Sequence, residues 1–454
     1  MKALFLTTLI FVTGLTIFGQ TSFQKTYGGP NNDLGLSVQQ TADGGYILFG
    51  ITKSFGSGDH DLYLVKTNNQ GNQQWSRTYA GTSSVHPFGS VMQTSDKGYI
   101  ICGSSGTNDP LVLIKTDPDG NEVWNKKFGA VHGQFVQQTS DGGFIAVGKT
   151  DSFGPQDTYM LKTDNSGNEE WNKVHKGGFA FEISQTSDGG YGMIGGSESG
   201  MYFVKTNGSG DTTWTRTFGT SSNVVGKSLY ATSDSGFILL GYEAELGGNL
   251  ILVKTDSLGN EQWSNYYGGT GRDIGRSVQQ TAEGGFVLVG QKENTVNGTQ
   301  EMYCIKTDDT GTVEWEYTYP NGILSEASSA WQTLDGGFVL LGSSKSTVGA
   351  DTDMFVVKID VRGLVSIYEK DSPELSVSAF PNPFTEYTTL QLNGPKNREF
   401  SLNVLNSQGQ IIRSINNLRP GQIRIERENL VSGLYFFQLL TGQQLVAGGK
   451  LIIK

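Results

Sequence analysis

The sequence predicts an all-β protein, a seven-bladed β-propeller followed by a small C-terminal Ig-like β-sandwich. Three observations indicate this fold class. Two short strings recur seven times along most of the chain, each repeat holds four strand-like segments, and glycine is abundant, with 63 among 454 residues. Four strands in every 45–53 residues is the length and strand content of a propeller blade.

The first recurring string reads Gln-Gln-Thr-Ala-Asp-Gly-Gly-Tyr at residues 39–46. Its Asp-Gly-Gly core predicts a tight hairpin between two strands, because glycine readily adopts the positive φ angles of such turns. The acidic residue of this turn recurs at intervals of 45–53 residues, at Asp43, Asp96, Asp141, Asp188, Asp234, Glu283 and Asp335.

A second string, with the consensus Leu-Val-Lys-Thr-Asp-x-x-Gly-Asn-x-x-Trp, follows each copy of the first. Its lysine occurs at Lys66, Lys115, Lys162, Lys205, Lys254, Lys306 and Lys358, and its tryptophan at Trp75, Trp124, Trp171, Trp214, Trp263 and Trp315. The Asp-to-Trp part resembles the tryptophan-docking motif of quinoprotein propellers, with one residue fewer between Asp and Trp. That motif is a blade-packing device, so the resemblance supports the fold and says little about a cofactor.

We predict that these repeated residues hold the blades together rather than form a ring of binding sites. The acid precedes the second strand and the lysine lies near the end of the third. Antiparallel pairing would therefore place both at one edge of the sheet, where an ion pair contributes about 0.2–1 kcal/mol. Glu283 is expected to keep a negative charge opposite Lys306. Each tryptophan is expected to be buried against the neighbouring blade.

The first unit and the two ends of the repeat region predict how the array closes. Strands are expected at residues 36–41, 46–51, 62–67 and 73–79. Residues 23–27, Phe-Gln-Lys-Thr-Tyr, are similar to the fourth strand of a unit but precede any first strand, and the last unit has Ile367 where tryptophan is expected. We expect the N-terminal strand to complete the last blade, which removes the exposed edges of an open solenoid, the alternative arrangement.

Composition and charge exclude several function classes. The chain has 33 basic and 44 acidic residues, a net charge of −11, and no basic cluster, so no nucleic-acid partner is expected. The four histidines lack metal-ligand spacing, and we predict no metal site and no cofactor. Cys102 and Cys304 lie in distant repeats, which favours buried free thiols over a disulfide.

The N-terminus predicts export. Lys2 precedes an uncharged apolar run that ends near Gly19, the pattern of a secretory signal peptide at residues 1–19. A membrane anchor is the alternative, but the run is shorter than the roughly 20 apolar residues of a membrane span. No later segment has the length and apolarity of a transmembrane helix, so no transmembrane span is predicted.

The repeat vocabulary stops after a linker at residues 369–374, and residues 375–454 contain alternating strands and turns. Four motifs occur in this segment: Pro381-Asn382-Pro383, the string 402–409 that ends in Gly409, the string 430–436 that contains Gly433 and Tyr435, and the final Lys450-Leu-Ile-Ile-Lys454. In this order they resemble the type A C-terminal sorting domains of the type IX secretion system. A generic glycan-binding sandwich is the alternative.

This resemblance implies the domain organisation and the destination of the chain. Residues 1–19 would be the signal peptide, 20–368 the propeller, 369–374 the linker and 375–454 the sorting domain. The type IX secretion machinery would be a partner through that domain. The product would be secreted or attached to the outer face of the outer membrane of a Gram-negative bacterium.

The repeat region contains no recognisable catalytic motif, so we predict no catalytic residues and name no ligand-binding ones. The leading hypothesis is a non-enzymatic binding or adhesion module for glycan or protein. The alternative is a secreted polysaccharide hydrolase or lyase. In either case the site is expected on the face of the variable two–three and four–one connections, near the central channel. The departures from the repeat that could mark an active site are His86, Arg272, Asp273 and Trp331.

Overall fold

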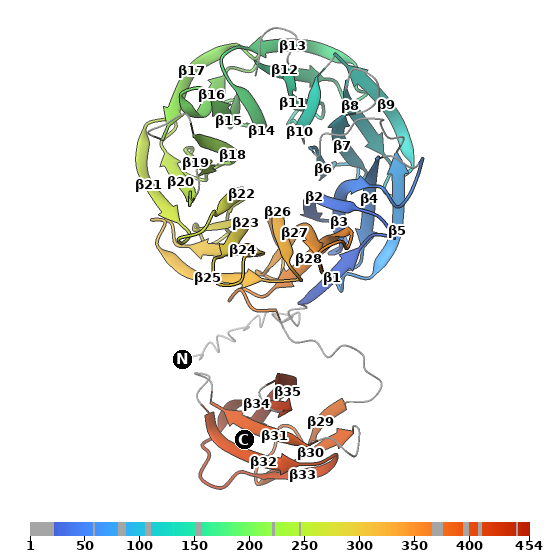
Figure 1. Ribbon diagram of the computed structural model, residues 1–454, viewed down its shortest axis with the longest axis vertical. Helices are drawn as coiled ribbons and strands as arrows, with labels where there is room; N and C mark the ends of the chain where they lie inside the picture. Colours follow the sequence, from blue (N-terminus) through green and yellow to red (C-terminus); the bar gives the residue numbers. More distant parts are fainter. Residues whose placement is uncertain are drawn as a thin grey trace, which may run out of the picture. The chain divides into compact units, whose positions relative to one another are not determined.

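The computed structural model describes residues 22–57, 60–79, 88–104, 110–129, 131–150, 157–219, 223–244, 247–365, 376–393, 399–406, 411–441 and 444–454. The predicted signal peptide at 1–19 and linker at 369–374 lie outside these residues. The chain divides into two compact units between Val365 and Ser366. All regular elements of the described residues are β-strands (Figure 1). In this part of the chain we find no helix with the length and apolarity of a membrane span.

Five sheets of the first unit contain four antiparallel strands each, in sequence order. They consist of β2 (Asp33–Gln40), β3 (Tyr46–Thr52), β4 (Asp61–Thr67) and β5 (Gln73–Tyr79); β6 (Ser90–Gln93), β7 (Tyr99–Ser104), β8 (Leu111–Thr116) and β9 (Glu122–Phe128); β10 (His132–Gln138), β11 (Phe144–Thr150), β12 (Asp157–Thr163) and β13 (Glu169–His175); β14 (Phe179–Gln185), β15 (Tyr191–Ser197), β16 (Gly200–Thr206) and β17 (Thr212–Phe218); and β18 (Val224–Ala231), β19 (Phe237–Glu243), β20 (Leu250–Thr255) and β21 (Glu261–Tyr267).

A further sheet of this unit contains eight strands. They are β22 (Ile274–Gln280), β23 (Phe286–Asn294), β24 (Thr299–Thr307), β25 (Val313–Tyr319), β26 (Leu324–Gln332), β27 (Phe338–Lys345), β28 (Thr352–Ile359) and β1 (Phe23–Tyr27). A single parallel contact, between Gln300 and Leu324, joins β24 to β26. The sheets form a ring in which β2, β6, β10, β14, β18, β22 and β26 are innermost (Figure 1). The prediction of an all-β propeller is confirmed.

The two ends of the propeller chain meet in one sheet. Strand β1 pairs antiparallel with β28, with Phe23 opposite Lys358 and Tyr27 opposite Met354. This pairing confirms the prediction that the N-terminal strand completes the last unit. Because β1 covers the free edge of β28, its backbone groups are paired rather than left open to another chain.

The propeller core lies between neighbouring sheets. Residues of the middle strands β3 and β4 are buried along their whole length. The reason is that each of these sheets packs against a neighbour on both sides, so both sets of side chains are covered. Cys102 in β7 and Cys304 in β24 are buried and free, as predicted.

The second unit contains two antiparallel sheets. One consists of β29 (Ser376–Phe380), β30 (Tyr387–Asn393) and β33 (Gly421–Glu426), and the other of β32 (Ile411–Leu418), β31 (Phe400–Leu405), β34 (Gly433–Thr441) and β35 (Gln444–Ile453). Leu390 and Ile425 from the first sheet share a buried cluster with Leu402, Phe437 and Leu451 from the second. This cluster gives the unit its own core.

Candidate functional site

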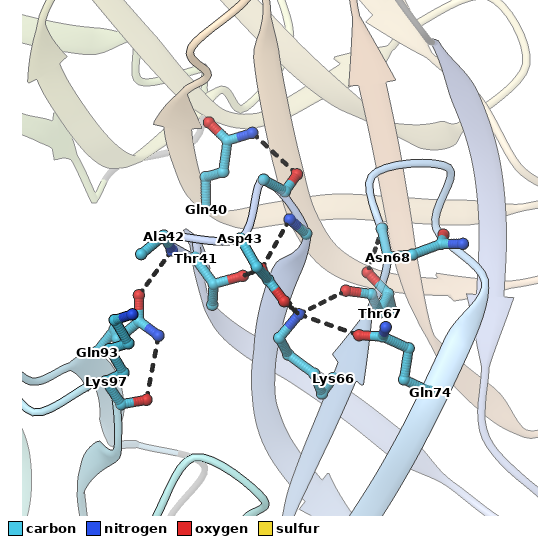
Figure 2. Close-up of polar contacts among 12 residues, drawn as sticks. Gln40, Thr41, Ala42, Asp43, Lys66, Thr67, Asn68, Gln74, Gln93 and Lys97 are labelled. Atoms are coloured by element: carbon cyan, nitrogen blue, oxygen red, sulfur yellow. Dashed lines mark hydrogen bonds and ion pairs between the residues drawn. The ribbon is translucent and has the colours of Figure 1, made fainter.

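In six repeats a buried lysine ties the hairpin between the first and second strands to the third strand, as Figure 2 shows for the first repeat. In the first repeat Lys66 Nζ lies 2.8 Å from Asp43 Oδ2 and donates to the carbonyl oxygen of Thr67 at 2.9 Å and to Gln74 Oε1 at 3.1 Å. The carboxylate of Asp43 also accepts hydrogen bonds from the Thr41 hydroxyl and the Gly45 amide. All donors and acceptors come from one sheet, so the cluster joins the hairpin to that sheet.

The same ion pair recurs around the propeller. The nitrogen–oxygen distances are 2.8 Å for Lys115–Asp96, 2.9 Å for Lys162–Asp141, 2.8 Å for Lys205–Asp188, 2.7 Å for Lys254–Asp234 and 3.1 Å for Lys358–Asp335. The lysine side chains are buried in every case. An inward ammonium that already has several acceptors is suited to structure rather than to ligand binding.

The repeat with glutamate differs from our expectation. Lys306 Nζ forms its ion pair with Glu314, at 3.0 Å, and donates to the Thr307 carbonyl at 2.7 Å. Glu283 instead accepts a hydrogen bond from Gln332 Nε2 at 3.3 Å. Lys162 shows the intermediate case, because its ammonium contacts both Asp141 and Glu170.

Electrostatics agree with this structural role. Burial alone would raise the pKa of Asp43, but hydrogen bonds from Lys66, Thr41 and Gly45 hold the pKa below its usual value. Partial burial again opposes the shift at Asp141, Asp188 and Asp234, where hydrogen bonds from a lysine, a threonine and a glycine amide lower the pKa to about 2. These carboxylates are ionised at neutral pH and already hydrogen-bonded.

The two glycines of the hairpin have different roles. Gly44 has a φ of +81°, as the turn requires. Gly45 does not adopt positive φ, contrary to our expectation that both glycines would; a Cβ there would lie 2.6 Å from Lys66 Nζ and 2.1 Å from the Thr67 carbonyl oxygen. The second glycine is therefore needed for space beside the lysine. Lys97 and Ser235 occupy the position of the first glycine in two repeats and take φ of 68°.

The repeated tryptophans are half-buried, not fully buried as expected, and each packs on a glycine of the next repeat. A Cβ on Gly120, Gly167 or Gly210 would meet the ring of Trp75, Trp124 or Trp171 at 2.7–2.9 Å. The same contact occurs for the later tryptophans, at Gly259 with Trp214, Gly311 with Trp263 and Gly363 with Trp315. Each of these glycines has positive φ in the turn that follows the third strand, so turn geometry and packing against the tryptophan require the same residue.

Strand β1 reproduces this contact at the closure of the ring. A Cβ on Gly71 would meet the Phe23 ring at 2.5 Å, the relation that Trp75 has to Gly120. The Tyr27 hydroxyl donates to the Gly71 carbonyl at 2.5 Å, as Tyr79 does to Gly120 at 2.7 Å. Phe23 therefore takes the place of the tryptophan that is absent near Ile367.

Glutamine side chains join the hairpins of neighbouring sheets. Gln93 Oε1 accepts a hydrogen bond from the Ala42 amide at 2.8 Å (Figure 2), and Gln40 Oε1 accepts one from Leu334, across the ring closure, at 2.7 Å. Equivalent bonds run from Ser95 to Gln138, Ser140 to Gln185, Ser233 to Gln280 and Ala282 to Gln332. Ala231 occupies the glutamine position of β18.

The inner strands surround a cavity of about 360 Å³. Six of them have a one-residue β-bulge at the same place, and the bulged residue lines the cavity. The bulged residues are Leu36, Gln134, Phe181, Lys227, Arg276 and Ser328. Bulges re-aim side chains and often lie beside functional sites. The residue before the bulge is glycine or alanine in each of these six strands, whereas the bulged residue differs in each.

Three successive inner strands make one part of this cavity charged and aromatic. Lys227 Nζ lies 3.2 Å from the centre of the Phe181 ring. Arg276 Nη2 lies 3.8 Å from Glu326 Oε2. Glu182 Oε2 accepts a hydrogen bond from the Leu229 amide at 3.1 Å, at the position where most other inner strands have serine.

Burial in the cavity changes the protonation of two of these groups. It raises the pKa of Glu182 to about 7 and, together with the charge of Arg276, lowers the pKa of Lys227 to about 7. Sequence analysis did not single out Phe181, Glu182, Lys227 or Arg276. The sequence does contain a signal for these residues, because each departs from the repeat within a first strand. That signal became interpretable only when the bulge showed which positions face the cavity.

The departures that sequence analysis did select lie elsewhere, with one exception. Asp273 is buried and accepts hydrogen bonds from the Gly269 amide at 2.6 Å and the Glu293 amide at 3.0 Å, so it holds a loop. The Arg272 amide likewise donates to Glu293 Oε2 at 2.7 Å. Trp331 lines the central cavity. His86 lies outside the described residues. Among the residues that the structure describes, no group of three or more histidine, cysteine or acidic side chains is arranged to hold a metal ion.

A second, open cavity of about 560 Å³ lies beside the hairpin of β23 and β24, at a variable two–three connection. Lys292 Nζ there lies 4.5 Å from the Tyr303 ring centre and 4.0 Å from Glu316 Oε1. The Tyr303 hydroxyl in turn donates to Glu316 Oε2. Lys292, Tyr303 and Glu316 are thus paired with one another.

The sequence motifs of the second unit meet around its C-terminal strand. Asn382 Nδ2, between Pro381 and Pro383, donates to the Lys450 carbonyl at 2.7 Å, and Asn382 Oδ1 accepts from the Ile452 amide at 2.8 Å. Arg427 Nη1 donates to the carbonyl oxygen of Lys454 at 2.7 Å.

The Leu-x-x-Gly-x-Tyr motif of this unit forms the start of β34. Gly433 begins the strand with a φ of +158°, and the Tyr435 hydroxyl donates to the Val431 carbonyl at 3.0 Å. Gly409 lies outside the described residues.

Residues 378–454 match the family model of the secretion system C-terminal sorting domain. The match covers the segment in which the four motifs occur in order. The chain therefore carries a type IX sorting domain. A type IX sorting domain is recognised by the type IX secretion machinery, so this protein is secreted or attached to the cell surface.

Solved structures similar to the chain share little of its sequence. The Dos1 propeller is 12% identical, with 75% of this chain and 96% of that one covered and a TM-score of 0.47. A protein of unknown function from Dyadobacter fermentans is 10% identical, with 75% and 98% covered and a TM-score of 0.46. The extracellular domain of a hybrid two-component system from B. thetaiotaomicron is 11% identical, with 92% and 67% covered and a TM-score of 0.36. No curated protein matches the chain.

Proposed function

We propose that the type IX sorting domain exports a non-enzymatic β-propeller that binds glycan or protein at the cell surface. In this proposal residues 1–19 are a signal peptide, 20–368 the propeller, 369–374 a linker and 375–454 the sorting domain. The ligand enters from the face of the variable connections and reaches the central cavity. The destination is the medium or the outer face of the outer membrane of a Gram-negative bacterium.

The observation that carries the binding role is the contrast between the residues that hold the sheets together and the bulged residues of the inner strands. Lysines, acids, glycines and tryptophans that hold the sheets together are repeated and mutually bonded. The bulged residues that line the cavity, from Leu36 to Ser328, are instead different in each strand. A rigid scaffold with a varied, concave surface is the common design of a recognition module.

The proposal includes seven blades and an Ig-like tail. Strands β22–β25 and β26–β28 with β1 would be two blades, which the single contact between Gln300 and Leu324 connects. In support, the aromatic-on-glycine contact occurs once for each of the six tryptophans and once for Phe23. Two antiparallel sheets around a shared core support an Ig-like sandwich for the tail.

Export is tested by deletion of residues 375–454. We expect the truncated chain to accumulate in the periplasm while the full chain reaches the surface or the medium, as measured by fractionation and immunoblotting. A milder variant, Asn382→Ala, removes both hydrogen bonds to β35 and should reduce export. Unimpaired export of the truncated chain would refute this part of the proposal.

Binding is tested with a glycan array and a polysaccharide-degradation screen on the same purified protein. We expect saturable binding to a restricted set of glycans, without release of shorter products. Turnover of any bound polysaccharide would contradict a non-enzymatic role.

One observation favours the alternative, a secreted polysaccharide hydrolase or lyase. Glu182 lies in the central cavity, and burial raises its pKa to about 7. A carboxyl group with a pKa near the operating pH is suited to act as a general acid or base. In that case Glu182→Gln would abolish turnover of a polysaccharide that the protein still binds. Under the binding proposal, Glu182→Gln has no turnover to abolish.

A further inference from the structure

The charged part of the central cavity is formed by three neighbouring inner strands. Phe181 in β14, Lys227 in β18 and Arg276 in β22 occupy the same bulge position, so the same local geometry aims all three side chains at the cavity. Because the bulge comes early in each inner strand, this part lies toward the face of the variable four–one connections. A ligand that enters from that face meets these residues first.

The two cations of this part are poorly compensated. Among the ion pairs of the described residues, none involves Lys227, whose ammonium lies 3.2 Å from the Phe181 ring centre and 6.0 Å from that of Tyr242. Arg276 has Glu326 at 3.8 Å, beyond hydrogen-bond distance. The repeated lysines differ, because Lys66 and its equivalents are surrounded by carboxylate and carbonyl oxygens. A half-buried cation without an anion is stabilised by a ligand that brings one.

Aromatic rings adjoin these cations. The Phe181 ring lies 5.0 Å from that of Phe179 and 6.0 Å from that of Phe88, centre to centre. Aromatic side chains provide apolar contact for the C–H groups of a ligand ring. The cavity volume of about 360 Å³ lies within the range of roughly 300–1,000 Å³ typical of small-ligand pockets.

We propose that Phe181, Lys227 and Arg276 form a subsite for an acidic sugar unit. The anionic group, a carboxylate or a sulfate ester, would lie between the ammonium of Lys227 and the guanidinium of Arg276. The C–H groups of the sugar ring would pack beside Lys227 against the aromatic side chains of Phe181 and Phe88, which both line the cavity. This inference rests on the proposed function, because it names the class of glycan that the propeller binds.

The test is isothermal titration of the purified protein with three tetrasaccharides of equal length: an oligogalacturonate, a sulfated galactan fragment and a neutral galactan fragment. We expect at least one acidic tetrasaccharide to bind at least tenfold more tightly than the neutral one. The preferred acidic ligand identifies the anionic group.

Substitutions locate the site. Lys227→Met and Arg276→Met should each weaken the acidic ligand at least tenfold and leave the neutral one within twofold, whereas Lys227→Arg should retain most of the affinity. Lys127→Met, on the exposed part of the outer strand β9, is the matched control and should change nothing. The melting temperature of each variant shows whether it is folded. If Lys227→Met does not fold, the Lys227→Arg variant keeps the test valid.

The outcomes separate this inference from the proposed function. Equal affinity for acidic and neutral tetrasaccharides, or acidic binding that both Met variants retain, overturns the subsite and leaves the binding role in place. If no glycan on the array binds and a pull-down from surface proteins captures no partner, the proposed function itself is overturned, and the subsite with it.

Discussion

The hairpin ends and the inner-strand bulges of the propeller use the same residue types in opposite ways. At the hairpin end, Lys66 is buried among Asp43, Gln74 and a backbone carbonyl. At the bulge, Lys227 is half-buried against an aromatic ring and has no carboxylate partner in the described part of the chain.

The difference shows how a repeat protein separates stability from recognition. A residue with all its partners inside one sheet can recur in every sheet, because each sheet presents the same partners. A residue that faces the central cavity contacts side chains from several strands, so no repeated environment constrains it. Variation therefore accumulates where the scaffold does not depend on it.

The largest expected effect concerns closure of the ring. Phe23→Ala should lower the free energy of unfolding by about 3–5 kcal/mol, because it removes a buried ring from the contact with Gly71 and leaves a cavity. Urea unfolding followed by tryptophan fluorescence measures the change. Gln24→Ala, at an exposed position of the same strand, is the control and should change little. Equal effects of the two variants would show that β1 does not close the ring.

The same substitution at the two kinds of lysine tests the comparison directly. Lys66→Met should lower the free energy of unfolding by about 1–3 kcal/mol, because the Thr67 carbonyl and Asp43 lose a buried donor. Lys227→Met should leave it unchanged within about 0.5 kcal/mol or raise it, since an unpaired, half-buried charge disappears. Parallel urea titrations provide the measurement. Similar losses at both positions would contradict the distinction.

Glu182 should make stability depend on pH in a defined direction. Its pKa is raised to about 7 in the folded chain, above its usual value of 4.5, so its contribution is fully present below pH 4.5 and is lost as pH rises through 7. Glu182→Gln should therefore have little effect at pH 4.5 and stabilise the protein by about 1–2 kcal/mol at pH 8, after allowance for solvent in the cavity.

Melting temperatures at the two pH values measure this difference. Glu122→Gln, at an exposed position of β9, serves as the matched control. If the difference in melting temperature between Glu182→Gln and the unmodified chain is the same at pH 4.5 and pH 8, the assigned direction of the pH dependence is wrong.

The smallest expected effect would extend the scaffold. Ala231 occupies the position at which other inner strands have a glutamine. The side-chain oxygen of that glutamine accepts a hydrogen bond from a backbone amide of the preceding hairpin, as Gln93 does from Ala42. Ala231→Gln should provide an acceptor for the amide of Ser187 and raise the free energy of unfolding by about 0.5–1 kcal/mol. Ala231→Glu tests whether a charged acceptor serves equally well. No gain from either variant would show that the repeated glutamine bond contributes nothing to stability.

Much of the scaffold was predictable because its determinants are local. Asp43 and Lys66 lie on adjacent segments of one repeat, and their spacing in the chain determines which sheet edge they share. The exception, Lys306 with Glu314, occurs where the hairpin acid is a glutamate and a second glutamate follows the lysine by eight residues; Lys162 also has such a glutamate but keeps its contact with Asp141. Comparison of the repeat sequences reveals that second glutamate, but it does not give the distance between its carboxylate and the lysine ammonium.

The sequence by itself determined the repeat, the strand order, the N-terminal strand as the missing fourth strand and the sorting motifs. Each depends on residues close together in the chain or on an ordered set of short motifs. Only the tertiary structure decided that Phe181, Lys227 and Arg276 share one cavity, and that Asn382 holds the final strand. The physical reason is that a one-residue bulge changes which side chain faces inward, and the ring then joins residues that lie about fifty positions apart.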